Sequence, residues 1–149
     1  MFGNQQVFMD QLDADSATAQ NELGTLRYED GNRYMYVQNA ASTDTVDKQA
    51  VIFLHAADYT ITPTCVATKP IAGIAQSVIS AGQYGWIQVG GMADATNRAS
   101  DVDDGVQAYC ASTTGVLAAI DGTAQGSAVI VAYGVADATS NVAKVYINL

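Results

Sequence analysis

Short strand-forming runs separated by turn residues cover most of this chain of 149 residues, and their spacing limits the folds open to it. Each run is rich in Val, Ile, Tyr or Thr and is bounded by Gly, Asp, Asn or Ser, the pattern of short strands joined by turns. The runs lie at 25–28, 33–38, 50–55, 59–66, 70–79, 84–89, 106–110, 116–120, 128–136 and 142–149. About nine short strands predict an all-β domain, either a compact β-barrel or a jelly-roll-like β-sandwich. These two stay open because they differ only in closure.

Local signals place several of these elements. Asp30-Gly31 between two strand-forming runs predicts a tight hairpin, because glycine accepts the positive φ that such a turn demands. Pro63 is expected to end its strand or to place that strand at a sheet edge. The stretches 72–89 and 133–149 echo each other, since each is a small-residue turn followed by a polar spacer and a strand. We therefore expect one kind of unit to be used twice.

Helix signals are few. Only residues 10–22 and 93–100 are helix candidates, and the Ala- and Asp-rich stretch 92–104 is otherwise expected to form a loop. A helical layer packed on the strands is therefore not expected.

The first 24 residues are rich in Gln, Asp and Ala and show weak periodicity. We expect an N-terminal arm at 1–24, followed by a single β domain at 25–149. A short helix over 6–12 is an alternative, but an extended arm that orders on a partner is favoured. The apolar residues expected to bind that partner are Phe2, Val7, Phe8 and Leu12.

The charge balance excludes some classes of partner. Six Lys and Arg against 15 Asp and Glu give a formal net charge of −9, so nucleic acid and anionic membrane surfaces would repel the chain. The sequence has no run of about 18 or more apolar residues, and its start lacks the basic and apolar regions of a signal peptide. We expect neither nucleic acid nor membrane as a partner. The surface, with few charged residues, suits a protein that lies against others.

Catalytic and cofactor signatures are missing from the sequence. The patterns G-x-S-x-G, G-x-x-x-x-G-K-[ST], G-x-G-x-x-G and H-E-x-x-H do not occur, so we expect no enzyme and no cofactor. His55, the single histidine, follows four apolar residues in an expected buried strand, and a structural role is favoured over a general base or metal ligand. The acidic residues 101–104 differ from an EF-hand, because glycine comes fifth and Ser112 twelfth. An acidic turn is favoured there, with a weak Ca²⁺ or Mg²⁺ site as the alternative.

Two further groups of residues each allow two interpretations. Cys65 and Cys110 form no C-x-x-C motif, and free core cysteines are favoured over a disulfide. Tyr84 and Trp86 lie in a glycine-bracketed aromatic stretch that could be a contact surface, for instance for sugars, or a packed end of the domain. The alternation of side chains along this run is typical of a half-buried strand and favours the packed end of the domain.

The chain resembles small structural proteins of tailed bacteriophages, in particular capsid decoration (cement) proteins. The likeness covers about residues 24–149 and lies in the patterns at 73–91, at 103–117 and from 133 to the end, most clearly in Tyr84-Gly85-Trp86-Ile87-Gln88-Val89. It implies a compact β domain, commonly a homotrimer, that binds the major capsid protein on the outer capsid surface of the virion and stabilises the shell. The N-terminal region often helps to fasten such proteins. A phage tail, baseplate or fibre component remains an alternative, as do a carbohydrate-binding adhesin module and a small hydrolase.

Overall fold

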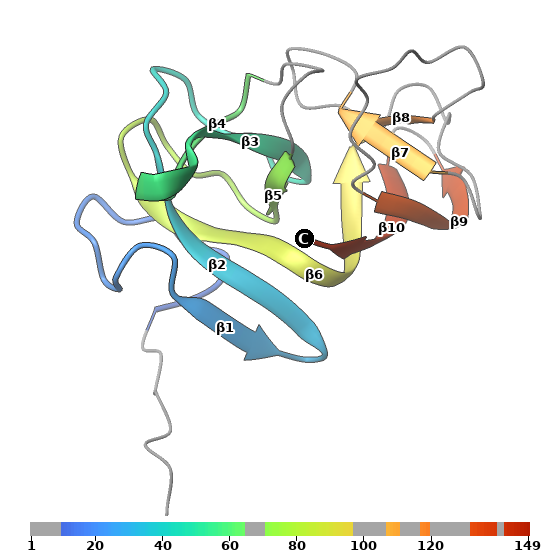
Figure 1. The fold of residues 1–149 in the computed structure, drawn as a ribbon, viewed down its shortest axis with the longest axis horizontal. Coiled ribbons are helices and arrows are strands. Elements are labelled where there is room, and N and C mark those ends of the chain that lie inside the picture. Colours follow the sequence, from blue (N-terminus) through green and yellow to red (C-terminus); the bar gives the residue numbers. More distant parts are fainter. Residues whose placement is uncertain (1–9, 65–70, 97–106, 111–116, 120–131, 140–141) are drawn as a thin grey trace, which may run out of the picture.

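The computed structural model describes residues 10–64, 71–96, 107–110, 117–119, 132–139 and 142–149, and this part of the chain is all-β apart from one short 3-10 turn (Figure 1). The elements are β1 (Leu26–Glu29), β2 (Asn32–Asn39), β3 (Gln49–His55), η1 (Ala56–Asp58), β4 (Thr60–Thr62), β5 (Ile71–Ala75), β6 (Tyr84–Thr96), β7 (Gln107–Cys110), β8 (Leu117–Ala119), β9 (Ala132–Thr139) and β10 (Val142–Asn148). Among the described residues, no helix is long and apolar enough to span a membrane.

Five strands close into a barrel. The sheet order is β1-β2-β4-β3-β5-β6-β10-β9-β7-β8, and an additional pairing joins β2 to β6, which closes the ring β2-β4-β3-β5-β6. The closing pair is antiparallel and runs from Arg33↔Gly90 to Gln38↔Tyr84. β2 and β4 form a parallel pair, and the other ladders are antiparallel. The predicted compact all-β domain is confirmed, and the β2–β6 ladder makes it a barrel.

β6 belongs to the barrel at its start and to an outer sheet at its end. Its 13 residues pair first with β2 and β5, and from Gly90 to Thr96 they pair with β10. The loop expected at 92–104 is therefore wrong as far as Thr96, and the helix candidate at 93–100 is not found there either. The physical reason is alternation, since Ala93 and Ala95 are buried on one face of the strand while Asp94 faces away, half-exposed.

The bend of β6 depends on two glycines. Gly91 has φ +91°, and a register shift in the β2–β6 ladder lies between the pairs Arg33↔Gly90 and Tyr34↔Gln88. A β-carbon on Gly90 would lie 3.2 Å from the β-carbon of Arg33, so the hairpin could not approach as closely. The glycines thus allow β6 to leave the barrel and pair with β10.

Three local predictions can be compared with the structure. The Asp30-Gly31 hairpin is confirmed, with φ +50° and +79° in a two-residue turn between β1 and β2. β4 ends directly before Pro63, as expected. The expectation of a buried strand ending in His55 is wrong at its end, because β3 is buried from Gln49 to Ile52 but exposed at Leu54 and His55.

The echo between the two halves corresponds to two antiparallel hairpins. β5 pairs with β6, and β9 pairs with β10. The two outer members, β6 and β10, also pair with each other. In the described part, however, only the first hairpin belongs to the closed ring. The two copies of the pattern therefore have different places in the fold.

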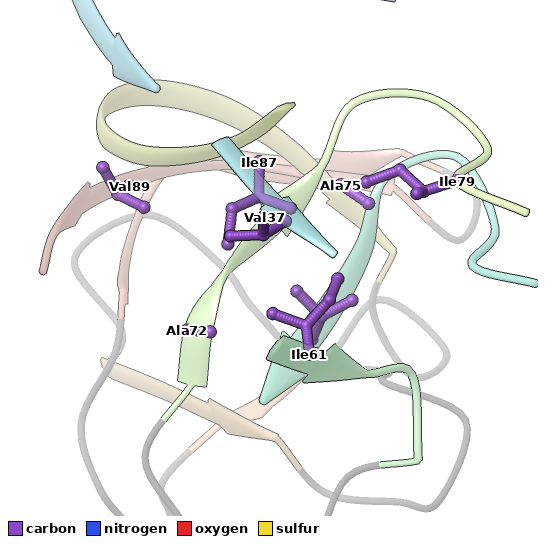
Figure 2. Close-up of a cluster of buried hydrophobic side chains, with 8 residues drawn as sticks. Val37, Ile61, Ala72, Ala75, Ile79, Ile87 and Val89 are labelled. Carbon is purple, nitrogen blue, oxygen red and sulfur yellow. The ribbon is translucent and has the colours of Figure 1, made fainter. Parts of the chain in front are cut away.

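The core fills the barrel (Figure 2). It is built from Val and Ile with small alanines, and Met35 and Phe53 pack against it from the edge. Its buried members are Val37, Val51, Ile61, Ala72, Ala75, Ile79, Ile87 and Val89. Burying one such branched side chain contributes about 1.5–3 kcal/mol, so closure of the barrel is driven mainly by these residues.

The helix candidate at 10–22 does not form a helix. These residues form turns and bends on the outside of the barrel, where Ser16 forms an antiparallel bridge with Tyr84 through two 2.9 Å main-chain hydrogen bonds. The carboxylates of Asp10 and Asp15 accept hydrogen bonds from Trp86 Nε1 and from the Ser80 amide. These tertiary contacts outweigh the weak helix propensity of the segment.

Candidate interaction surfaces

Three aromatic rings form a second cluster on the outer face of the barrel. Tyr36 of β2 lies 5.0 Å from Trp86 of β6 between ring centroids, tilted by 59°, and 6.4 Å from Tyr84, nearly parallel. Tyr36 and Trp86 are partners in the β2–β6 ladder, while their neighbours Val37 and Ile87 point into the core. This outer aromatic cluster exists because the two strands alternate together.

The N-terminal segment covers this cluster. The Asp10 carboxylate accepts hydrogen bonds from Trp86 Nε1 at 2.6 Å and from Asn21 Nδ2 at 2.9 Å. The Gln20 amide donates to the Tyr36 hydroxyl at 3.0 Å. The Arg27 guanidinium lies 5.8 Å from the centre of the indole and donates to the Asp10 main-chain oxygen. Residues 10–24 of the predicted arm are thus fastened to the barrel.

Two pKa values reflect these contacts. Burial raises the pKa of Tyr36 above its usual value of 10.0, although the hydrogen bond from the Gln20 amide opposes this shift. The pKa of Asp15 is lowered by hydrogen bonds from the side chain and the amide of Ser80, which favour the charged carboxylate. Two contacts between the segment and the barrel therefore differ in charge. One uses the buried, neutral Tyr36 hydroxyl of the barrel, and the other uses the charged Asp15 carboxylate of the segment.

A groove of about 180 Å³ lies at the other end of β2, where the β1–β2 hairpin, the bend of β6 and the end of β10 meet. Two tyrosines, two asparagines and one arginine line it, with three glycines between them. We name it the tyrosine groove, and its lining residues are Tyr28, Gly31, Asn32, Arg33, Gly90, Gly91, Tyr146 and Asn148. Tyr28 and Arg33 are cross-strand partners in the hairpin.

Among the residues that line the groove, Arg33 is the charged one. Its Nη2 donates to the main-chain oxygens of Leu149 and, at 3.5 Å, of Val89. The other three cations of the described part each pair with an acidic side chain. These ion pairs are Arg27 with Glu29, Lys48 with Asp47 and Lys144 with Asp94. Within the described residues Arg33 has no ion pair with an Asp or Glu side chain, although the chain carries a net charge of −9.

Exposed apolar side chains surround the groove. Tyr28 is 72% exposed and Tyr146 47%, and Met92 stands beside Tyr146 in the β6–β10 ladder. Leu26, two residues before Tyr28 in β1, and Leu149, whose oxygen accepts from Arg33, are exposed as well. Exposed tyrosine, methionine and arginine close together are typical of a surface that binds another protein.

The barrel has a counterpart among solved structures. It resembles the base of a phage head fiber. The crystal structure of the head fiber gp8.5 N base in bacteriophage phi29 matches with a TM-score of 0.56 and 13% sequence identity, over 77% of this chain and 94% of that chain. No protein-family model and no curated protein matches the sequence. At this identity the match shows a shared fold.

Of the candidate contact residues named from the sequence, three are buried or half-buried and three lie outside the described part. Trp86 is 1% exposed and Tyr84 half-buried, so both pack beneath or beside the N-terminal segment, and the indole has no free face on which a sugar could stack. Leu12 is half-buried, whereas Phe2, Val7 and Phe8 lie outside the described residues.

The candidate metal and cysteine positions are not described. Residues 101–104, Cys65 and the side chain of Cys110 lie outside the described part. Within that part no three His, Cys, Asp or Glu side chains come together as a metal site would require. His55 lies at the exposed end of β3.

No sequence pattern had predicted the tyrosine groove. Tyr28 and Arg33 flank the predicted hairpin turn, but Tyr146 is more than a hundred residues away, and only the β6–β10 pairing brings it there. The usable signal was Gly90-Gly91, a glycine pair inside a strand, which marks a bend or a close backbone approach.

Proposed function

We propose that this chain is a structural, non-enzymatic protein of a tailed-phage virion that binds the outer surface of the head and stabilises the shell. The main support is the shared fold with a head fiber base over 77% of the chain. The likeness of the sequence patterns to capsid decoration proteins agrees with it. Such a role needs many modest contacts repeated over a symmetric lattice, whose strengths combine.

The proposed partner is the major capsid protein, bound through the arm residues that precede Asp10. Phe2, Val7 and Phe8 supply apolar side chains for such a contact, with Leu12 at its root. The hydrogen bonds of Asp10 to Trp86 and Asn21 provide a fixed point from which the arm starts. A firmly anchored root lowers the entropy lost when the arm binds.

Copies of the chain are proposed to form a homotrimer on the capsid surface. A contact between one surface of a subunit and a different surface of the next gives a closed ring when the rotation between subunits closes. A trimer also matches the symmetry expected where capsid subunits meet around a three-fold position.

The test uses heads of the parent phage that lack the protein. Purified full-length chain and a variant lacking residues 2–9 are mixed with the heads and sedimented. We expect the full chain to sediment with the heads and to raise the temperature at which they release DNA, whereas the truncated chain stays in solution. Failure of the full chain to bind heads, or binding to isolated tails instead, would overturn the proposal.

The length of the deletion matters. Removing residues 2–23 would also strip the cover from Trp86 and Tyr36 and expose apolar rings. Loss of binding would then report a damaged domain. The shorter deletion ends before Asp10, so unchanged tryptophan fluorescence shows that the barrel is intact.

A second candidate is the base of a head fiber, favoured by the fold shared with the phi29 head fiber base. Cryo-electron microscopy of the virion separates the two. A cement protein occupies equivalent positions over the whole lattice, whereas a fiber base is found at the foot of each projecting shaft.

A further inference from the structure

We propose that copies of this chain join head to tail, with an acidic valine knob of one copy docked in the tyrosine groove of the next. The valine knob consists of Asp44, Val46, Asp47 and Val78. This inference rests on the proposed homotrimer and names its two contacting surfaces.

The knob is a rigid projection. Val46 begins a tight turn in which the Gln49 amide donates to the Val46 main-chain oxygen at 3.1 Å, and Lys48 has φ +63°. The Gln49 side-chain oxygen accepts from the Val46 amide at 2.6 Å. The turn therefore presents Val46 in one orientation, at 61% exposure.

Thr45 fastens the two halves of the knob together. Its hydroxyl accepts from the Ile79 amide at 2.7 Å and donates to the Ser77 oxygen, and its own amide donates to the Ile79 oxygen at 3.0 Å. These bonds hold Val78 beside Val46. The knob therefore loses little conformational entropy on docking, because its backbone is already ordered.

The knob and the groove are complementary in charge and polarity. Asp44 and Asp47 flank Val46, and the Asp47–Lys48 pair is loose at 3.9 Å. Arg33 lines the groove together with two exposed tyrosines, and in the described part it donates to main-chain oxygens but pairs with no acidic side chain. Docking would pair Arg33 with these carboxylates and cover the valines with tyrosine rings.

Exposed apolar groups are concentrated on these two surfaces. The described part has nine exposed large hydrophobic residues, and only Leu54 and Tyr59 lie elsewhere. The other seven are Val46 and Val78 at the knob, and Leu26, Tyr28, Met92, Tyr146 and Leu149 around the groove. A contact between knob and groove would therefore join the two places where most of these exposed large hydrophobic side chains lie.

The geometry requires two copies. β2 begins with Asn32, which lines the groove, and ends at Asn39, after which the loop that carries Val46 follows. The Thr96 amide donates to the Lys48 oxygen at 2.8 Å and the Thr45 amide donates to the Ile79 oxygen at 3.0 Å. These bonds fix the knob beside the end of β6, so it cannot move into the groove of its own chain. Different surfaces in contact form a heterologous interface, which closes into a ring when the rotation allows.

The experiment is a charge swap in the full chain, with solution mass measured by light scattering over a range of concentrations. Arg33→Glu and Asp47→Arg are each expected to weaken assembly at least about tenfold, because each places like charges together. The double variant should recover the oligomer, since it restores opposite charges. Val46→Asp should weaken assembly as well, and Leu54→Asp, at an exposed apolar site outside both surfaces, should not.

Several results would overturn the inference. These are a wild-type chain that stays monomeric at every concentration, single variants that assemble normally, or a double variant that fails to recover. If Arg33→Glu does not fold, Val46→Asp at the exposed knob still decides. Binding to phage heads is measured separately by sedimentation, so loss of the ring and failure of capsid attachment remain distinguishable.

Discussion

The indole Nε1 of Trp86 donates a 2.6 Å hydrogen bond to the carboxylate of Asp10, which lies 76 residues earlier in the chain. The bond joins the N-terminal segment to the outer aromatic cluster, opposite the hydrophobic core of the barrel. Trp86 therefore acts as an anchor for the root of the arm. This role differs from that of a surface aromatic that meets a ligand.

Replacing Asp10 should loosen the segment. Asp10→Ala removes the acceptor for Trp86 Nε1 and Asn21 Nδ2, and leaving a buried donor without this acceptor costs about 1–3 kcal/mol. We expect a lower free energy of unfolding in urea and a red shift of tryptophan emission, which reports the single tryptophan. Asp13→Ala, an exposed position on the same segment, is the control. An unchanged emission spectrum in Asp10→Ala would argue against the anchoring role.

Two glycines with similar backbone angles should respond differently to alanine. Gly82 has φ +78° and open space around a new β-carbon, so Gly82→Ala should cost about 1–2 kcal/mol from backbone strain alone. Gly91 has φ +91°, and its β-carbon would lie 3.1 Å from the Gly31 oxygen and collide with Asn32. Gly91→Ala should cost about 1–3 kcal/mol more. Equal losses in thermal unfolding would show that the bend does not require close packing.

Acid should weaken the attachment through Asp15. The folded state holds the pKa of Asp15 below its usual 3.8, so the stabilisation is fully present above that value and is lost as pH falls through the lowered pKa. In Asp15→Asn this dependence should vanish. The difference in unfolding free energy between the two proteins should therefore be constant near neutral pH and should shrink below pH 3.8. A difference that does not change with pH would contradict the assigned cause.

Alkali should act through Tyr36. Because burial raises the pKa of this hydroxyl, the neutral form is favoured in the folded state, and stability falls as pH rises above the usual value of 10.0. Tyr36→Phe should be less stable at neutral pH by about 0.5–1.5 kcal/mol, through loss of the hydrogen bond from the Gln20 amide. Above pH 10.0 it should lose less stability than the wild type. If the unfolding free energies of the two proteins fall in parallel between about pH 8 and about pH 11, this assignment is contradicted.

Much of the fold followed from local patterns. Asp30-Gly31 predicted the hairpin because both residues adopt positive φ, and Pro63 predicted the end of β4 because it cannot donate to a ladder. The alternation of residues around Trp86 favoured a packed strand over a contact surface, and Trp86 is 1% exposed. At Ala93 and Ala95 the inward-facing residues of β6 are alanines, which give a weak strand signal. This part of the strand was therefore mistaken for a loop or a helix.

The sequence by itself determined that the chain is all-β, where the β1–β2 hairpin turns and where β4 ends, since these depend on neighbours along the chain. Tertiary structure alone decided that the barrel closes through β2 and β6, that Asp10 covers Trp86, and that Tyr146 joins Tyr28 and Arg33 in one groove. These contacts join residues far apart in sequence. Their free energy comes from burial and pairing that exist only once the barrel has closed.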